Sequence, residues 1–313
     1  MRLKEYLALF MLAALWGASF LFIKVAVADM TPLTLVAIRL IIGTLGLLWL
    51  IPFRPSITRG WRSRLKGYFI VAIFNAIIPY LTISWGEQYI PSGMAAILNA
   101  TTPLAIVIIS NWWPGGERIT WLRAGGVLVG FLGVAVLVGP TVFGVQTSTL
   151  YLPGAGSALL GAISYAFGSL FASRMLRGLP SLQPAIGQNA MGAVILAPIA
   201  AVALFIQPQP APQIAVGWSI AALLALALGG TALAYIFYYW LIERVGPTRT
   251  LIVTYLLPCM ALVYGAILLH EAVGINALGG LALVLLGIFF TGKKTGPRSQ
   301  EVEAIKPEQD IQL

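Results

Sequence analysis

Charged residues are scarce in this sequence. Asp, Glu, Lys and Arg make up 9% of its 313 residues, whereas 59% are hydrophobic, and an average soluble domain carries about 25% charged residues. The chain therefore has too little polar surface to cover a water-soluble fold of this size. This scarcity excludes an ordinary soluble domain and predicts an all-α protein embedded in a lipid bilayer.

Cysteine and histidine are nearly absent, with only Cys259 and His270 in the whole chain. A single cysteine cannot form a disulfide within the chain or supply a thiolate metal cluster. The sequence also lacks an HExxH motif, paired carboxylates, and a Ser or Cys nucleophile with a histidine partner in mid-membrane. We therefore expect no enzyme activity, no catalytic residue, no metal and no cofactor.

Ten stretches of about 20 residues are nearly free of charge, which is the length that a helix needs to cross the hydrocarbon core of a bilayer. We predict spans at residues 6–28, 32–53, 67–86, 92–113, 121–139, 152–173, 182–206, 218–242, 250–269 and 272–291. The last residues, 293–313, are rich in Lys, Glu, Gln and Pro and predict a solvated cytoplasmic tail.

The basic residues predict the orientation of these spans, because short loops rich in Lys and Arg stay on the cytoplasmic side. With the N-terminus inside, all 19 Lys and Arg residues except Lys24 and Arg39 fall in cytoplasmic segments. Both termini are therefore predicted in the cytoplasm. The net charge of +9 does not indicate a nucleic-acid partner, since these residues are scattered rather than gathered on one solvated face.

The two halves of the sequence repeat the same features in the same order. In each half a glutamate precedes a proline by four residues, and a second proline follows eleven or twelve residues later. Another glutamate is then followed by glycines nine and sixteen residues further on. The matching pairs are Glu87 and Glu243, Pro91 and Pro247, Pro103 and Pro258, Glu117 and Glu271, Gly126 and Gly280, and Gly133 and Gly287. This order indicates an internal repeat.

Each repeat would hold five spans, over residues 1–140 and 151–292. Five is an odd number, so the second repeat enters the membrane from the opposite side to the first. Inverted repeats of this kind bind a substrate near the midplane and expose it to each side in turn. The sequence therefore predicts a transporter that works by alternating access.

The chain resembles the EamA-type branch of the drug/metabolite transporter superfamily over residues 5–292. The resemblance lies in Trp16, Gly17, Ser19, Lys24, Arg39, Pro103, Glu117, Arg118, Gly126 and Gly133, and in Gly246, Pro247, Pro258, Gly265, Glu271, Gly280 and Gly287. The sixth span departs from the pattern, with Tyr165 where the first span has Trp16. The resemblance implies ten helices, the inner membrane of a bacterium or archaeon, and export of amino acids, related metabolites or toxic compounds.

Apart from Arg123 at the cytoplasmic end of its span, Lys24 and Arg39 are the only charged residues within the predicted spans, and a charged residue costs about 2.5–3.5 kcal/mol at the bilayer centre. Lys24 either extends to the lipid headgroups or binds a substrate carboxylate in a cavity. Arg39 is predicted to line the cavity or to pair with another residue inside the protein. No Asp or Glu lies mid-span. Proton coupling would run through Glu87, Glu271 or His270, and the alternative is an uncoupled facilitator.

Polar and aromatic side chains within the spans are the remaining candidates, because a zwitterion in a cavity needs hydrogen-bonding groups and flat rings. Some of them would instead bond neighbouring helices. The predicted substrate-binding set is Trp16, Ser19, Lys24, Arg39, Asn75, Tyr80, Asn99, Thr101, Tyr165, Asn189, Tyr235 and Tyr238, with Thr231 and Tyr255 as further candidates.

The leading functional hypothesis is a secondary transporter that exports small metabolites, with amino acids first. Multidrug efflux is an alternative, which a wide aromatic cavity would favour. Transport of nucleotide sugars or sugar phosphates is another, but it calls for more basic residues than Lys24 and Arg39. The expected partners are membrane lipid and a small-molecule substrate, with protons as a candidate coupling ion and a homodimer as a candidate assembly.

Overall fold

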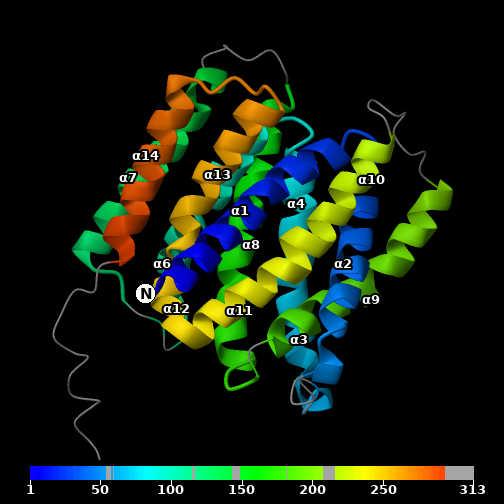
Figure 1. Ribbon diagram of the computed structural model, residues 1–313. Helices are drawn as coiled ribbons and strands as arrows, with labels where there is room; N and C mark the ends of the chain where they lie inside the picture. Colours follow the sequence, from blue (N-terminus) through cyan, green and yellow to red (C-terminus); the bar gives the residue numbers. More distant parts are fainter. Residues whose placement is uncertain are drawn as a thin grey trace, which may run out of the picture.

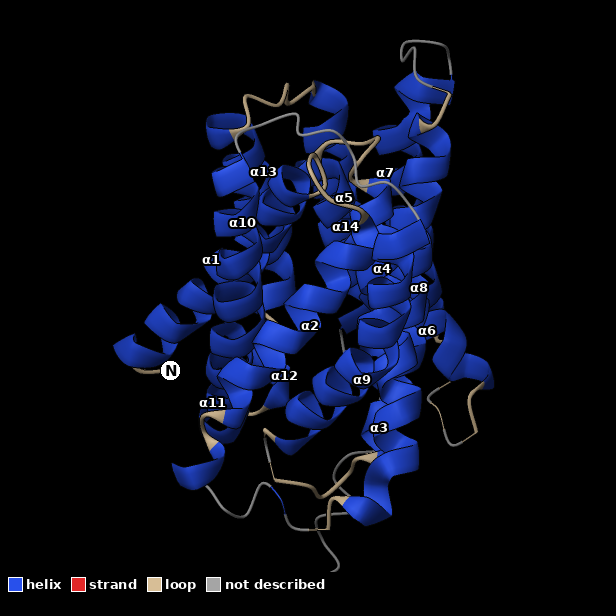
Figure 2. Ribbon diagram, turned by 90° about the vertical axis from the view of Figure 1, so that its right-hand side faces the viewer, coloured by secondary structure: helices blue, strands red, loops and turns tan. Residues whose placement is uncertain are grey.

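The computed structural model describes residues 1–53, 58, 60–114, 116, 118–142, 149–180, 182–206 and 216–292. The predicted tail, residues 293–313, and Glu117 lie outside the described residues. Over the described residues the chain forms a bundle of helices, as an all-α protein should (Figures 1 and 2).

The helices follow one another along the chain with short connections. The first half contains α1 (Leu3–Ala26), α2 (Pro32–Leu48), α3 (Leu65–Ala72), α4 (Ile78–Gly86), α5 (Ser92–Asn99), α6 (Thr102–Trp112) and α7 (Trp121–Val142). The second half contains α8 (Tyr151–Met175), α9 (Gln183–Ile206), α10 (Val216–Leu224), α11 (Ala234–Val245), α12 (Pro247–Thr250), α13 (Val253–Leu268) and α14 (Ile275–Gly292). Two π-helical stretches, Ile73–Ile77 and Ala225–Leu233, join α3 to α4 and α10 to α11.

Eight helical segments are long and apolar enough to cross a membrane, and α2 and α13 are apolar but shorter. The predicted span 32–53 extends too far, because α2 ends at Leu48. A separate 3-10 helix, Ile51–Phe53, follows it and does not continue α2. The predicted span 92–113 is divided into α5 and α6, because Pro103 has no backbone N–H to continue the first helix.

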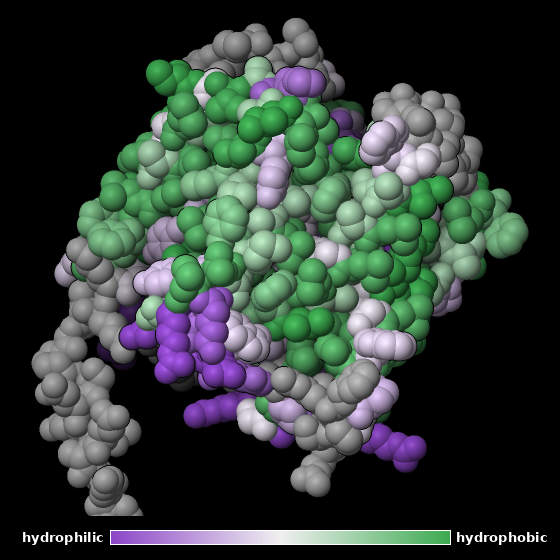
Figure 3. Space-filling view, in the orientation of Figure 1, coloured by the Kyte–Doolittle hydropathy of each residue, from purple (hydrophilic) through white to green (hydrophobic). Residues whose placement is uncertain are grey.

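Large apolar side chains cover the outside of the bundle. Phe131 on α7, Phe205 on α9 and Phe289 on α14 are all exposed. Figure 3 shows hydrophobic residues over most of one face, with hydrophilic residues gathered at its lower end. In a bilayer such a surface contacts lipid rather than water.

The helix ends define two ends of the bundle. At the N-terminal end, α1 and α3 begin and α8 and α11 finish (Figures 1 and 2). Arg64 before α3 donates a hydrogen bond of 2.9 Å to the carbonyl of Met175 there. At the opposite end, α1 and α13 finish and the turn between α4 and α5 connects those helices.

Helices α7 and α14 lie side by side with their backbones in close contact (Figure 1). A Cβ atom added at Gly126 would come within 2.8 Å of the carbonyl oxygen of Gly287, and one at Gly133 within 2.8 Å of that of Gly280. The absence of a side chain at these positions therefore permits the approach.

Candidate functional site

A cavity of about 430 Å³ lies between the helices, within the range of about 300–1,000 Å³ for small-molecule sites. It extends from Ile23 and Ile83 inside the bundle toward Ala172 and Leu251, which are near the N-terminal end. Most of the predicted substrate-binding set lines it: Trp16, Ser19, Arg39, Asn75, Tyr80, Asn99, Tyr165, Tyr235 and Tyr238.

Arg39, on α2, is the only charged side chain among the described residues that line the cavity. It is buried, with 5% of its surface exposed. Its Nε donates a hydrogen bond of 3.0 Å to the hydroxyl of Thr231, and its Cζ lies 3.8 Å from the centre of the Tyr80 ring. Its two Nη atoms bond no other described residue, so their N–H groups are available to a ligand.

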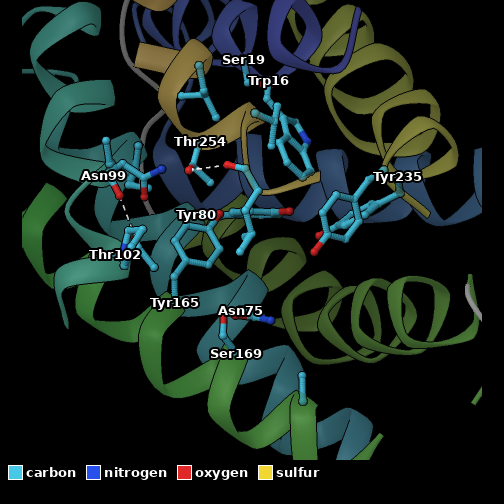
Figure 4. A pocket seen from close by; sticks show the side chains of 18 of the residues that line it. Trp16, Ser19, Asn75, Tyr80, Asn99, Thr102, Tyr165, Ser169, Tyr235 and Thr254 are labelled. Atoms are coloured by element: carbon cyan, nitrogen blue, oxygen red, sulfur yellow. Dashed lines mark hydrogen bonds between the residues drawn. The ribbon is translucent and has the colours of Figure 1, made fainter. Parts of the chain in front are cut away.

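Aromatic rings form much of the cavity wall. On one side, Trp16 of α1 contacts Tyr235 and Tyr238 of α11, with ring centres 6.4 and 5.3 Å apart. The rings of Tyr80 of α4 and Tyr165 of α8 lie edge to face, 6.4 Å apart. Figure 4 shows these two tyrosines together, with Trp16 and Tyr235 across the cavity from them. Apolar or aromatic parts of a ligand can pack between such rings.

Two asparagines add unpaired acceptors to this wall. Asn75 lies on the π-helical stretch Ile73–Ile77, and Asn99 is the last residue of α5. The side-chain oxygen of each is buried and accepts no hydrogen bond from any described residue. A buried polar atom without a partner is unfavourable, but neither oxygen is exposed to the cavity, so a ligand could reach it only if the side chain turned.

Three residues of the predicted set lie outside the cavity lining. Lys24 directs its ammonium group to the carbonyl oxygens of Glu87 and Ile90, at 2.5 and 2.9 Å. Thr101 and Asn189 bond carbonyls one helical turn earlier in their own helical segments. The two further candidates also lie outside the lining. Thr231 accepts the hydrogen bond from Arg39, and Tyr255 does not line the cavity.

The cavity also contains polar residues that the sequence analysis missed, namely Thr102, Ser169, Gln188, Tyr239 and Thr254. Gln188 and Thr102 are the immediate neighbours of Asn189 and Thr101, which were chosen instead. Gln188 donates a hydrogen bond of 2.7 Å to the hydroxyl of Tyr235. Successive helical residues point about 100° apart, and here Gln188 and Thr102 line the cavity while Asn189 and Thr101 do not. The sequence carries no clear signal for Ser169 and Thr254.

The model of the EamA-like transporter family matches residues 3–139 and 152–293, once in each half of the chain. The chain belongs to the EamA-like transporter family. It is therefore a multi-pass membrane transporter, and the resemblance noted in the sequence is confirmed.

Similar proteins are known from bacteria and archaea. The uncharacterized transporter YoaV of Bacillus subtilis is 22% identical over 91% of this chain and 96% of its own length. An uncharacterized transporter of Archaeoglobus fulgidus is 24% identical over 93% and 100%. The uncharacterized inner membrane transporter YedA of Escherichia coli is 28% identical over 90% and 86%. One solved crystal structure has the same fold, with a TM-score of 0.61 at 20% identity over 93% of this chain and 96% of that one.

Proposed function

We propose that this chain is a secondary transporter that exports small zwitterionic metabolites, amino acids first, across the cytoplasmic membrane by alternating access. The observation that carries the proposal is the buried guanidinium of Arg39, which faces the cavity with both Nη atoms unbonded to described residues. A guanidinium binds a carboxylate through two parallel hydrogen bonds. A substrate carboxylate would therefore offset the cost of the buried charge.

The other cavity groups suit the rest of an amino acid. Asn75 and Asn99 line the cavity, and a turn of either side chain would let its oxygen accept a hydrogen bond from a substrate ammonium group. The rings of Trp16, Tyr80 and Tyr235 can contact an apolar or aromatic side chain. A nucleotide sugar or sugar phosphate fits less well, because Arg39 is the only basic group among the described lining residues.

The number and length of the helices are consistent with ten membrane crossings arranged in two inverted repeats. The eight long segments and the two shorter helices α2 and α13 together supply ten. One pair of features adds support: the π-helical stretches end at Ile77 and Leu233, each ten residues before the matching Glu87 and Glu243. With the N-terminal end of the bundle in the cytoplasm, the cavity extends toward the cytoplasm, as it must to load an exported substrate.

The inverted repeat predicts labelling from opposite sides of the membrane. In a Cys259→Ala background, a cysteine that replaces Gln88 should react with an impermeant maleimide added outside the cell. One that replaces the exposed Glu243 should react only in inside-out vesicles. Unreplaced Cys259→Ala protein is the control for background labelling. Reaction of both cysteines from the same side would rule out the two-fold inverted arrangement.

The substrate is tested by efflux from cells that overproduce the protein. We expect resistance to one class of amino acids or their toxic analogues, with faster loss of the labelled amino acid from preloaded cells. Cells that carry the empty vector are the control. Protection against many cationic drugs without protection against amino acids would instead favour multidrug efflux through the aromatic walls, and would contradict the carboxylate role of Arg39.

A further inference from the structure

A layer of polar groups closes the bundle between the cavity and its opposite end. It consists of Lys24 on α1, Glu87 in the turn between α4 and α5, Ser92 at the start of α5, and Glu271 between α13 and α14. Ile83, one helical turn before Glu87, lines the inner end of the cavity. In the proposed orientation this polar layer therefore separates the substrate cavity from the external water.

Two of the charged side chains in the polar layer, Glu271 and Lys24, have hydrogen-bond partners in the protein. One carboxylate oxygen of Glu271 accepts a hydrogen bond of 2.8 Å from the backbone N–H of Ser92. The other accepts bonds from the Ser92 hydroxyl at 2.9 Å and the N–H of Gly93 at 3.3 Å. These donors stabilise an ionised carboxylate at a helix N-terminus. The ammonium of Lys24 is held by the carbonyls of Glu87 and Ile90, at 2.5 and 2.9 Å.

Glu87 is different, because its side chain has no such partners. The residue is fully buried, with 0% of its surface exposed. Neither carboxylate oxygen has a hydrogen-bond partner among the described residues. The ammonium of Lys24 is nearby, but it donates to the backbone oxygen of Glu87 and not to its side chain. A carboxylate buried without donors is strongly unfavourable, and such a group becomes neutral instead.

The surrounding charges do not offset the free-energy cost of burying Glu87 as a carboxylate. Lys24 and, more weakly, Arg39 favour the ionised form of Glu87, whereas Glu271 opposes it. Lys24 is close to Glu271 as well as to Glu87, so its single ammonium group interacts with two carboxyl groups. Burial is the largest effect, and it raises the pKa of the Glu87 carboxyl, which lies in the turn between two spans, well above its usual range.

We propose that Glu87 is a proton-binding site, filled from the external side, whose protonation allows the external end of the transporter to close. The proposal rests on the proposed function, since the external side and the alternation between two states come from it. When the external end is open, water reaches Glu87 and the carboxylate takes a proton from it. Closure buries the neutral acid, and reopening returns the proton to water. Acid outside the cell therefore favours the closed external end.

The test measures access to the cavity from outside and needs no substrate. Ile83→Cys is introduced into the Cys259→Ala background, and right-side-out vesicles are treated with an impermeant maleimide at about pH 6 and about pH 8. A second protein carries Ile275→Cys, whose side chain is 89% exposed at the same end of the bundle. Its labelling corrects for the greater reactivity of thiols at alkaline pH. The same measurements are made with Glu87→Gln and with the control Glu243→Gln.

We expect the corrected labelling of Ile83→Cys to rise several-fold from the acidic to the alkaline condition. Glu87→Gln, whose side chain is always neutral, should stay poorly labelled at both, whereas Glu243→Gln should respond like the parent. Labelling that is independent of pH in the parent protein would overturn the proposal, even if Glu87→Gln fails to reach the membrane. An equal response in Glu87→Gln, or its loss in Glu243→Gln, would overturn it too. Failure of the efflux assay alone would overturn only the proposed function.

Discussion

Replacement of Arg39 by glutamine is expected to reduce export of carboxylate substrates severely. The guanidinium is the only charge among the described cavity residues, and glutamine can neither balance the substrate carboxylate nor bind it through two charged N–H groups. Loss of one partner of a buried, hydrogen-bonded charge pair costs about 2 kcal/mol or more, roughly thirtyfold in affinity. The measurement is efflux of the labelled amino acid to which the wild-type protein confers resistance, at matched membrane levels of the two proteins.

Two further variants identify the cause of that loss. Arg64→Gln also removes an arginine, but Arg64 lies outside the cavity lining and bonds the carbonyl of Met175, so export should persist. Arg39→Lys retains the charge without the planar fork and should retain part of the export. Wild-type export by Arg39→Gln would show that the carboxylate binds elsewhere. Equal losses in Arg39→Gln and Arg64→Gln would point to a general effect on folding.

The helical class could be predicted from the sequence because the physical constraint is simple. A helix that crosses a bilayer needs about 20 apolar residues, and such runs are visible without knowledge of their neighbours. Helix interruptions are less visible. The matching prolines Pro103 and Pro258 look alike in the sequence, yet Pro103 lies in the first turn of a new helix, α6, and Pro258 lies inside the continuous helix α13. The packing around each proline, which the sequence does not show, decides between these outcomes.

The sequence predicted most of the polar residues that line the cavity, but it did not show in which direction some side chains point. Arg39 was a strong candidate because a charge inside a span needs a partner or a cavity. Lys24 satisfied the same rule, but its partners are the backbone carbonyls of Glu87 and Ile90. Backbone carbonyls leave no signature in the amino-acid sequence. Neighbouring polar residues such as Gln188 and Asn189 were confused because the rotation of a helix about its axis is set by tertiary packing.

Replacement of Gly126 by alanine is expected to lower the stability of the folded bundle. The added Cβ would lie 2.8 Å from the carbonyl oxygen of Gly287 and 2.9 Å from the Cβ of Phe290. Helices α7 and α14 would therefore have to move apart, and overpacking of this kind costs about 1–3 kcal/mol. We expect a lower midpoint of thermal unfolding for the purified protein in detergent. Gly287→Ala should act in the same way from the other helix, since its Cβ would lie 2.5 Å from the Gly126 oxygen.

The neighbouring residue provides a matched control. A Cβ atom added at Gly125 would meet nothing within 4 Å. Alanine is preferred over glycine in a helix by about 1 kcal/mol, so both substitutions gain the same helix propensity and differ only in what the methyl group contacts. Gly125→Ala should therefore unfold at the wild-type temperature or above it. If Gly126→Ala and Gly125→Ala unfold at the same temperature, close backbone contact between α7 and α14 does not stabilise the bundle.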